Sequence, residues 1–114
     1  MFGFFGSKAT FKTYAPTELR DHLGATGDAC LLVDVREDNE WATGHIPGAH
    51  HAPLSRFAEA ASRLPKEKAV IFYCQGGVRS KRAIGLAKPL GLTVDGHLGG
   101  GISAWRGANL PVEA

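Results

Sequence analysis

Cys74 is the residue of this sequence whose type and surroundings best suit chemistry. It follows the apolar run 69–73 directly, and Gly76, Gly77 and an expected helix come next. Adjacent glycines let a backbone curl so that successive N–H groups point at one spot, and the positive end of a helix strengthens the field there. We therefore predict an anion-binding loop around this sulfur.

The same surroundings predict a reactive form of the sulfur. A free cysteine has a pKa of about 8.5, and helix N-termini and nearby cations lower it to about 3.5 to 7.5. Arg79, Lys81 and Arg82 supply such cations, so we predict that Cys74 is largely a thiolate nucleophile at neutral pH. Cys30, in contrast, begins an apolar run, and we interpret it as a small buried residue at the other end of a sheet.

Short apolar runs alternate with helical patterns along the chain, which predicts an α/β domain with a mostly parallel sheet. The continuous runs 30–35 and 69–73 are typical of strands covered on both faces. A helix that begins at Pro16 should end near Leu23, because Gly24 and then Gly27 follow. Ligands of such sheets bind beyond the carboxyl ends of the strands, where the reactive cysteine lies. The expected strands are 11–14, 30–35, 49–52, 69–73 and 92–94, and the expected helices are 16–23, 37–43, 54–64, 80–90 and 102–105.

Length and composition indicate one ordinary folded domain. The 114 residues are 44% apolar and 21% charged, close to the averages of globular proteins. A net charge of +2 without a basic run gives no support to nucleic-acid binding, and the apolar stretch at residues 1–6 is too short to span a membrane. Two distant cysteines make no disulfide framework, so we expect a reducing compartment, the cytoplasm. We expect residues 1–10 to form a flexible segment and residues 11–114 to form the domain.

Several motifs together resemble the rhodanese family of sulfurtransferases, from about residue 11 to residue 112. The resemblance implies a single rhodanese-like domain with a five-stranded parallel sheet flanked by helices, and neither a metal nor an organic cofactor. The motifs, in chain order, are Leu32-Val-Asp-Val-Arg-Glu37 with Glu40-Trp41 and Gly44-His-Ile-Pro-Gly-Ala49, the loop Cys74-Gln-Gly-Gly-Val-Arg-Ser80, and Gly99-Gly-Gly-Ile-Ser-Ala-Trp105.

The resemblance also implies an activity. Cys74 would take sulfane sulfur from a small anionic donor, thiosulfate or another persulfide donor, and carry it as a persulfide. A thiophilic acceptor such as cyanide or a thiol would then remove the sulfur, which predicts ping-pong kinetics. Arg79 would contact the anionic donor or acceptor. The residues implied to bind the substrate are Gln75, Gly76, Gly77, Val78, Arg79 and Ser80.

Two related activities fit the loop less well. The cysteine phosphatases and arsenate reductases resemble H-C-x-x-x-x-x-R, whereas here four residues separate Cys74 from Arg79, and Tyr73 replaces the histidine. The mercaptopyruvate sulfurtransferases carry a loop of the form Cys-Gly-Ser/Thr-Gly-Val-Thr, from which Gln75 departs. Thiosulfate or a persulfide is therefore the favoured donor. A rhodanese-like module that binds a partner protein or relays sulfur to it remains the alternative, with a protein as the sulfur acceptor.

Asp34 and Arg36 lie at the same edge of the expected sheet as Cys74. They could act directly in catalysis, or they could form a buried charge network that fixes the following loop. We favour the network, because the sulfite released from thiosulfate is already an anion and needs no general acid.

The histidines do not have the spacing of a metal site, and we interpret them as structural residues. We expect His45 to hold the turn at residues 44–49 by hydrogen bonds. The sequence thus predicts no metal. The histidines considered are His45, His50, His51 and His97.

Overall fold

The computed structural model describes residues 11–114, and the expected segment 1–10 lies outside the described residues. Five strands form one parallel sheet in the order β1-β5-β4-β2-β3. The α/β class with a five-stranded parallel sheet is therefore confirmed. The strands are β1 (Lys12–Tyr14), β2 (Cys30–Asp34), β3 (His50–His51), β4 (Ala69–Tyr73) and β5 (Thr93–Leu98).

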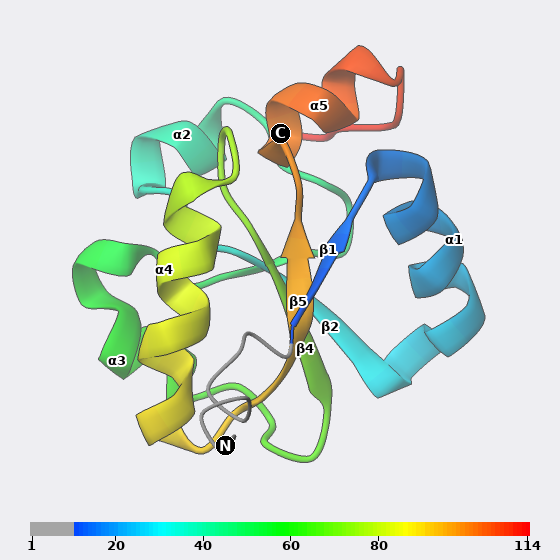
Figure 1. Ribbon diagram of the computed structural model, residues 1–114. Coiled ribbons are helices and arrows are strands. Elements are labelled where there is room, and N and C mark those ends of the chain that lie inside the picture. The colour runs from blue at the N-terminus through cyan, green and yellow to red at the C-terminus, as the bar shows by residue number, and fades with distance from the viewer. Residues whose placement is uncertain (1–10) are drawn as a thin grey trace, which may run out of the picture.

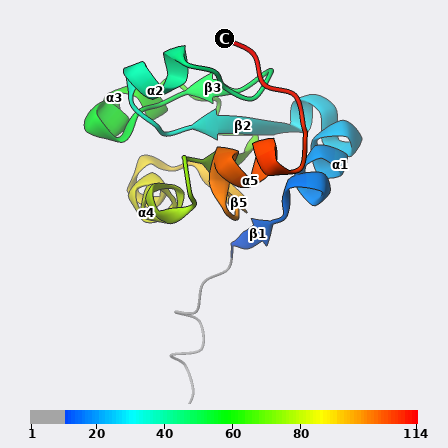
Figure 2. The same ribbon diagram turned by 90° about the horizontal axis from the view of Figure 1, so that it is seen from above.

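Helices cover both faces of this sheet (Figure 1). Figure 2 shows the sheet from above, with α3 and α4 on one side and α1 on the other. Among residues 11–114, none of the helices combines the length and the apolar character that crossing a bilayer requires. The helices are α1 (Pro16–Thr26), α2 (Asp38–Ala42), α3 (Phe57–Ala61), α4 (Val78–Ala87) and α5 (Gly101–Gly107), with short 3-10 turns η2 (Gly27–Ala29), η3 (Leu54–Arg56) and η4 (Lys88–Leu90).

The two apolar cores follow the alternation of side chains along the central strands. In β4, Val70 and Phe72 belong to the core under α3 and α4, whereas Ile71 and Tyr73 belong to the core under α1 and α5. Successive side chains of a strand point to opposite faces, so a strand buried on both faces contributes to both cores. Each fully buried large apolar side chain contributes about 1.5 to 3 kcal/mol. Strand β4 is thereby fixed on both sides, and it holds Cys74 at its carboxyl end.

Helix α1 is longer than the sequence predicted. It begins at Pro16 as expected but continues through Gly24 to Thr26. Gly27, with φ of 54°, follows the last helical residue, in a conformation that favours glycine. Glycine inside a helix costs only about 1 kcal/mol, which the packing of this helix offsets.

Strand β5 also extends beyond its prediction of 92–94 and continues to Leu98. The extension includes the polar residues Asp95 and His97, and both side chains have hydrogen-bond partners within the fold. At Gly96, which also lies in the extension, a Cβ would collide with the backbone of β1. Glycine is therefore needed at this position because β1 pairs closely with β5 there.

Candidate active site

The Cys74 sulfur lies inside a ring of backbone donors. The cysteine is 1% exposed, and it begins the loop 74–80, called here the cysteine loop, which runs between α2 and α5 (Figure 1). The N–H groups of Gly77 and Ser80 donate to Sγ at 3.1 and 3.3 Å. Gly77 has φ of 104°, a left-handed conformation that glycine adopts without strain. The turn at this glycine directs the following helix, α4, with its N-terminus toward the sulfur.

These contacts favour the thiolate. Burial alone would raise the pKa of Cys74, but hydrogen bonds from the Ser80 N–H and hydroxyl and from the N–H groups of Gly77 and Gly76 lower it below its usual value. The sequence predicted this effect from the N–H groups of the loop, the helix N-terminus and the cations Arg79, Lys81 and Arg82. In the structure the main causes that lower the pKa are the backbone and hydroxyl donors of the loop itself.

The loop is held in place by α5. The N–H groups of Ile102 and Ser103 donate to the carbonyl oxygens of Cys74 and Gln75 at 2.9 and 3.1 Å. A Cβ on Gly101 would collide with the same two oxygens. The closing glycine motif therefore allows the backbone of α5 to approach the cysteine loop closely enough to bind it.

A row of polar side chains, buried at Ser80 and His97, lies behind the sulfur, and the sequence did not predict it. Ser80 Oγ lies 2.8 Å from His97 Nδ1, and His97 Nε2 lies 3.2 Å from Thr13 Oγ1. Burial, with a further contribution from Lys81, lowers the pKa of His97, which favours the neutral imidazole. The Ser80 hydroxyl also donates to the Gly77 carbonyl oxygen at 3.2 Å, so it links His97 to the cysteine loop.

Arg79 forms a bidentate ion pair with Glu40. Its guanidinium nitrogens lie 2.7 and 2.8 Å from the two carboxylate oxygens. Arg79 lowers the pKa of Glu40 to about 2 against the opposing effect of burial, with help from the Glu37 N–H. The Cys74 charge also contributes to the raised pKa of Arg79, so the cation lies within electrostatic reach of the sulfur. To contact an anion directly, Arg79 must share or leave its carboxylate partner.

Comparison with known proteins identifies the family. A family model described as "Rhodanese-like domain" matches residues 15–108. The chain belongs to the rhodanese-like domain family. The resemblance found in the sequence is thus confirmed over most of the domain.

Relatives of this rhodanese-like domain differ greatly in length. The "Probable adenylyltransferase/sulfurtransferase MoeZ" of Mycobacterium tuberculosis is 41% identical over 95 residues, which cover 82% of this chain and 24% of MoeZ. The chain thus spans about a quarter of that relative's length. A "Sulfurtransferase" of Allochromatium vinosum is 38% identical over 96 residues, with coverage of 84% and 89%. The crystal structure of a thiosulfate sulfurtransferase from Pseudomonas aeruginosa matches with a TM-score of 0.77 at 32% identity, with coverage of 90% and 19%.

In this rhodanese-like domain, Asp34 and Arg36 form a buried pair beside the site. Arg36 Nη2 lies 2.8 Å from an Asp34 carboxylate oxygen and donates to the Gly44 carbonyl oxygen at 2.7 Å. A longer contact of 3.4 Å joins Arg36 to the Gln75 side chain. The pair thereby connects β2 to two of the loops at the carboxyl edge of the sheet. His45 lies at the start of the turn 44–49, and its Nδ1 is 3.2 Å from the Trp41 carbonyl oxygen.

The side chains of the predicted binding residues point in different directions. The Gln75 amide donates to Ser103 Oγ at 2.8 Å, Arg79 faces Glu40, and Val78 is 81% exposed to solvent. The sulfur is surrounded instead by backbone groups of the loop. Substrate contact by these six residues remains a prediction. Most of them would make that contact through their backbone N–H groups and not through their side chains.

Proposed function

We propose that this protein is a sulfurtransferase that carries sulfane sulfur as a persulfide on Cys74. The observation that carries the proposal is the buried Cys74 Sγ, which accepts hydrogen bonds from two loop N–H groups and has a lowered pKa. Such a site stabilises a sulfur anion and excludes bulk water from it. Relatives named as sulfurtransferases or putative sulfurtransferases support the same reaction class.

The reaction balances without an added acid, base or oxidant. The Cys74 thiolate attacks the outer sulfur of thiosulfate, the sulfur–sulfur bond breaks, and sulfite leaves with the electron pair. A persulfide anion remains on the cysteine. Cyanide or another thiophilic acceptor then attacks the outer sulfur of the persulfide, and the Cys74 thiolate departs as the leaving group.

The first turn of α4 supplies donors for the negative charge at each stage. The first N–H groups of a helix have no partner within the helix, and the helix N-terminus favours anions. In α4 these groups include those of Val78 and Arg79, whereas the N–H of Ser80 already donates to Cys74 Sγ. The first two are available to the outer sulfur of the persulfide and to a small anionic donor such as thiosulfate. We place this chemistry in the cytoplasm, where both free cysteines remain reduced.

Intact mass spectrometry tests the proposal. The purified protein is reduced, exposed to thiosulfate and weighed, in parallel with Cys74→Ser and Cys30→Ser. We expect a gain of about 32 Da, one sulfur atom, that requires Cys74 and disappears on treatment with dithiothreitol. An adduct that persists in Cys74→Ser, or no adduct with either thiosulfate or a small persulfide donor, would contradict the proposal.

A second candidate is a sulfur relay that discharges onto a partner protein. The exposed Val78 side chain favours it, because this apolar residue lies at the rim of the cysteine loop. Steady-state turnover with cyanide or small thiols supports the free-standing enzyme. A persulfide that forms but discharges only onto a protein thiol supports the relay.

A further inference from the structure

A second cluster of chemically capable side chains lies at the other end of the sheet from Cys74. It combines His22 of α1, Cys30 at the start of β2 and Asp95 of β5. One ligand atom of each residue lies within 4.8 Å of the others, and no other such trio of ligand residues is present among residues 11–114. Cys30 pairs with Ala69, the first residue of β4, whereas Cys74 follows the last. The cluster is therefore separate from the sulfur-transfer site.

The separations suit a tetrahedral metal ion. His22 Nε2 lies 3.2 Å from Asp95 Oδ2. Zinc bonds of about 2.0 to 2.2 Å to nitrogen and oxygen, at tetrahedral angles, place these two atoms about 3.4 Å apart, and the longer zinc–sulfur bond places sulfur about 3.6 Å from each. Two of the ligand atoms thus already have the required spacing. The Cys30 sulfur needs to approach them by little more than about 1 Å, by rotation about its side-chain bond.

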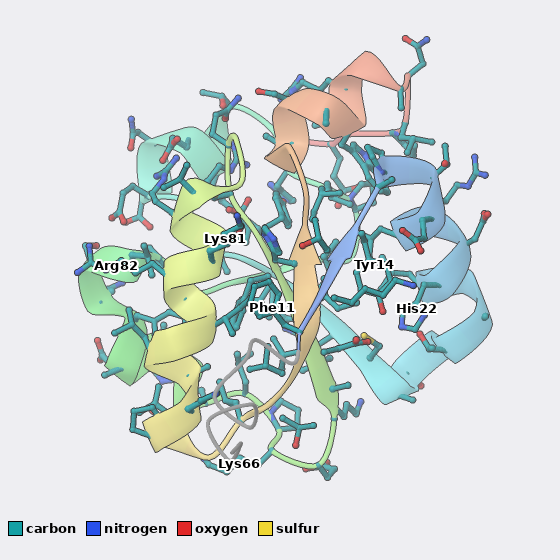
Figure 3. The ribbon with its side chains drawn as sticks, in the orientation of Figure 1. Phe11, Tyr14, His22, Lys66, Lys81 and Arg82 are labelled. Carbon is teal, nitrogen blue, oxygen red and sulfur yellow. The ribbon has the colours of Figure 1, made fainter. Side chains whose placement is uncertain are left out.

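Tyr14 fixes the carboxylate in position. Its hydroxyl donates to both oxygens of Asp95, at 3.1 and 3.0 Å. Its ring lies 5.0 Å from the ring of His22, and Figure 3 shows the two side chains extending toward one another from β1 and α1. Hydrogen bonds of this kind orient metal ligands in protein sites and raise affinity. The arrangement of the histidine and carboxylate is thus present without an ion.

Burial and charge also fit a cation. The side chains of His22 and Asp95 are 31% and 25% exposed, which leaves a path from solvent and space for a water ligand, whereas Cys30 is buried. A divalent ion would replace the thiol proton and compensate both negative ligands. Thiolate and imidazole together favour Zn²⁺ over Mg²⁺ or Ca²⁺.

We infer that His22, Cys30 and Asp95 form a Zn²⁺-binding site, completed by water, that connects α1 to β2 and β5. This inference does not rest on the proposed sulfur transfer, since the trio contacts none of the residues of the cysteine loop. The bound ion would act by stabilising the fold. The sequence pattern gave no sign of the site because its three ligands lie on separate elements with no characteristic spacing.

Cobalt titration of untagged Cys74→Ser protein tests the site. The chain has two cysteines, so Cys30 is the sole thiol in this background. Co²⁺ should bind with one-to-one stoichiometry and give a thiolate-to-cobalt charge-transfer band together with the visible bands of a tetrahedral ion. Zn²⁺ should displace it and raise Tm. The band should be absent from the double variant Cys74→Ser/Cys30→Ser.

Two further substitutions in the Cys74→Ser background keep the test decisive if Cys30→Ser unfolds the protein. His22→Gln and Asp95→Asn should each weaken Co²⁺ binding by at least about tenfold, since even the residues that merely orient ligands contribute about 10- to 100-fold. His50→Gln, at an exposed position, serves as the matched control and should retain the affinity of the parent. Absence of the charge-transfer band, or equal affinities of His22→Gln and its parent, would overturn the inference.

Discussion

Replacing Ser80 by alanine should raise the pKa of Cys74 while leaving the backbone ring intact. The hydroxyl of Ser80 contributes to the lowered pKa of the cysteine separately from the Ser80 N–H. A hydrogen bond to a charged group contributes about 1.5 to 3 kcal/mol, and one pKa unit corresponds to about 1.36 kcal/mol. Loss of the hydroxyl should therefore raise the pKa of Cys74.

The expected change in reactivity depends on pH. For each unit of increase in the pKa, the thiolate population well below the pKa falls about tenfold, but the more basic thiolate is about threefold more nucleophilic, with a Brønsted coefficient of about 0.4 to 0.5. Alkylation of Cys74 should thus be about threefold slower per unit at low pH and about threefold faster at high pH. The two pH profiles should cross.

The assay is the rate of iodoacetamide alkylation at Cys74 as a function of pH, followed by peptide mass so that Cys30 does not contribute. Ser103→Ala is the matched control, because its hydroxyl contacts Gln75 and not the sulfur. Circular dichroism should show that Ser80→Ala remains folded, although His97 Nδ1 loses its partner. Superimposable profiles of Ser80→Ala and wild type would refute the assigned role of the hydroxyl.

Three other substitutions test the network around the loop. Asp34→Asn leaves the buried charge of Arg36 without its partner and should cost about 3 to 5 kcal/mol in urea unfolding; an unchanged midpoint would contradict this. The ionised Glu40 stabilises the fold above pH 4.5, its pKa in the unfolded chain, and this stability is lost as pH falls toward about 2, its pKa in the fold. Glu40→Gln lacks this contribution, so the difference in unfolding free energy between it and wild type should shrink as pH falls over this range. The same change frees Arg79, and it should lower KM for thiosulfate; a raised KM would contradict a role of the guanidinium in anion binding. Gly101 has φ of 61°, and an added Cβ would collide with two carbonyl oxygens of the cysteine loop. Gly101→Ala should therefore lower the free energy of unfolding by about 1 to 3 kcal/mol and abolish persulfide formation. Gly107→Ala, where a Cβ meets open space, is the control and should change neither.

The sequence predicted the features that depend on neighbouring residues. The cysteine loop is a continuous segment between a buried strand and a helix, so its glycines and its position at the sheet edge were visible together. The strands β2 and β4 were evident from their continuous apolar runs. Both predictions relied on local pattern, which is where single-sequence reasoning is strongest.

The features that the sequence missed depend on contacts between distant residues. Ser80 and His97 are 17 positions apart, and Glu40 and Arg79 are 39 positions apart. Periodicity indicates which face of an element is buried but not which polar group lies opposite. His97 is an example: it is a polar residue in a buried part of β5, and its hydrogen-bond partner Ser80, which the local pattern does not reveal, makes that position suitable for it.

Dependence of the cysteine loop on α5 links reactivity to protein synthesis. The loop leaves the ribosome before Ile102 and Ser103, whose N–H groups bind its first two carbonyl oxygens. Until those residues are added and α5 packs, the loop lacks the hydrogen bonds that α5 supplies to its first two carbonyl oxygens, and we expect the cysteine of the nascent chain to keep a more ordinary thiol pKa. Electrophiles and oxidants encounter a poor nucleophile during that interval. The chain thus acquires its reactive sulfur only when folding is completed.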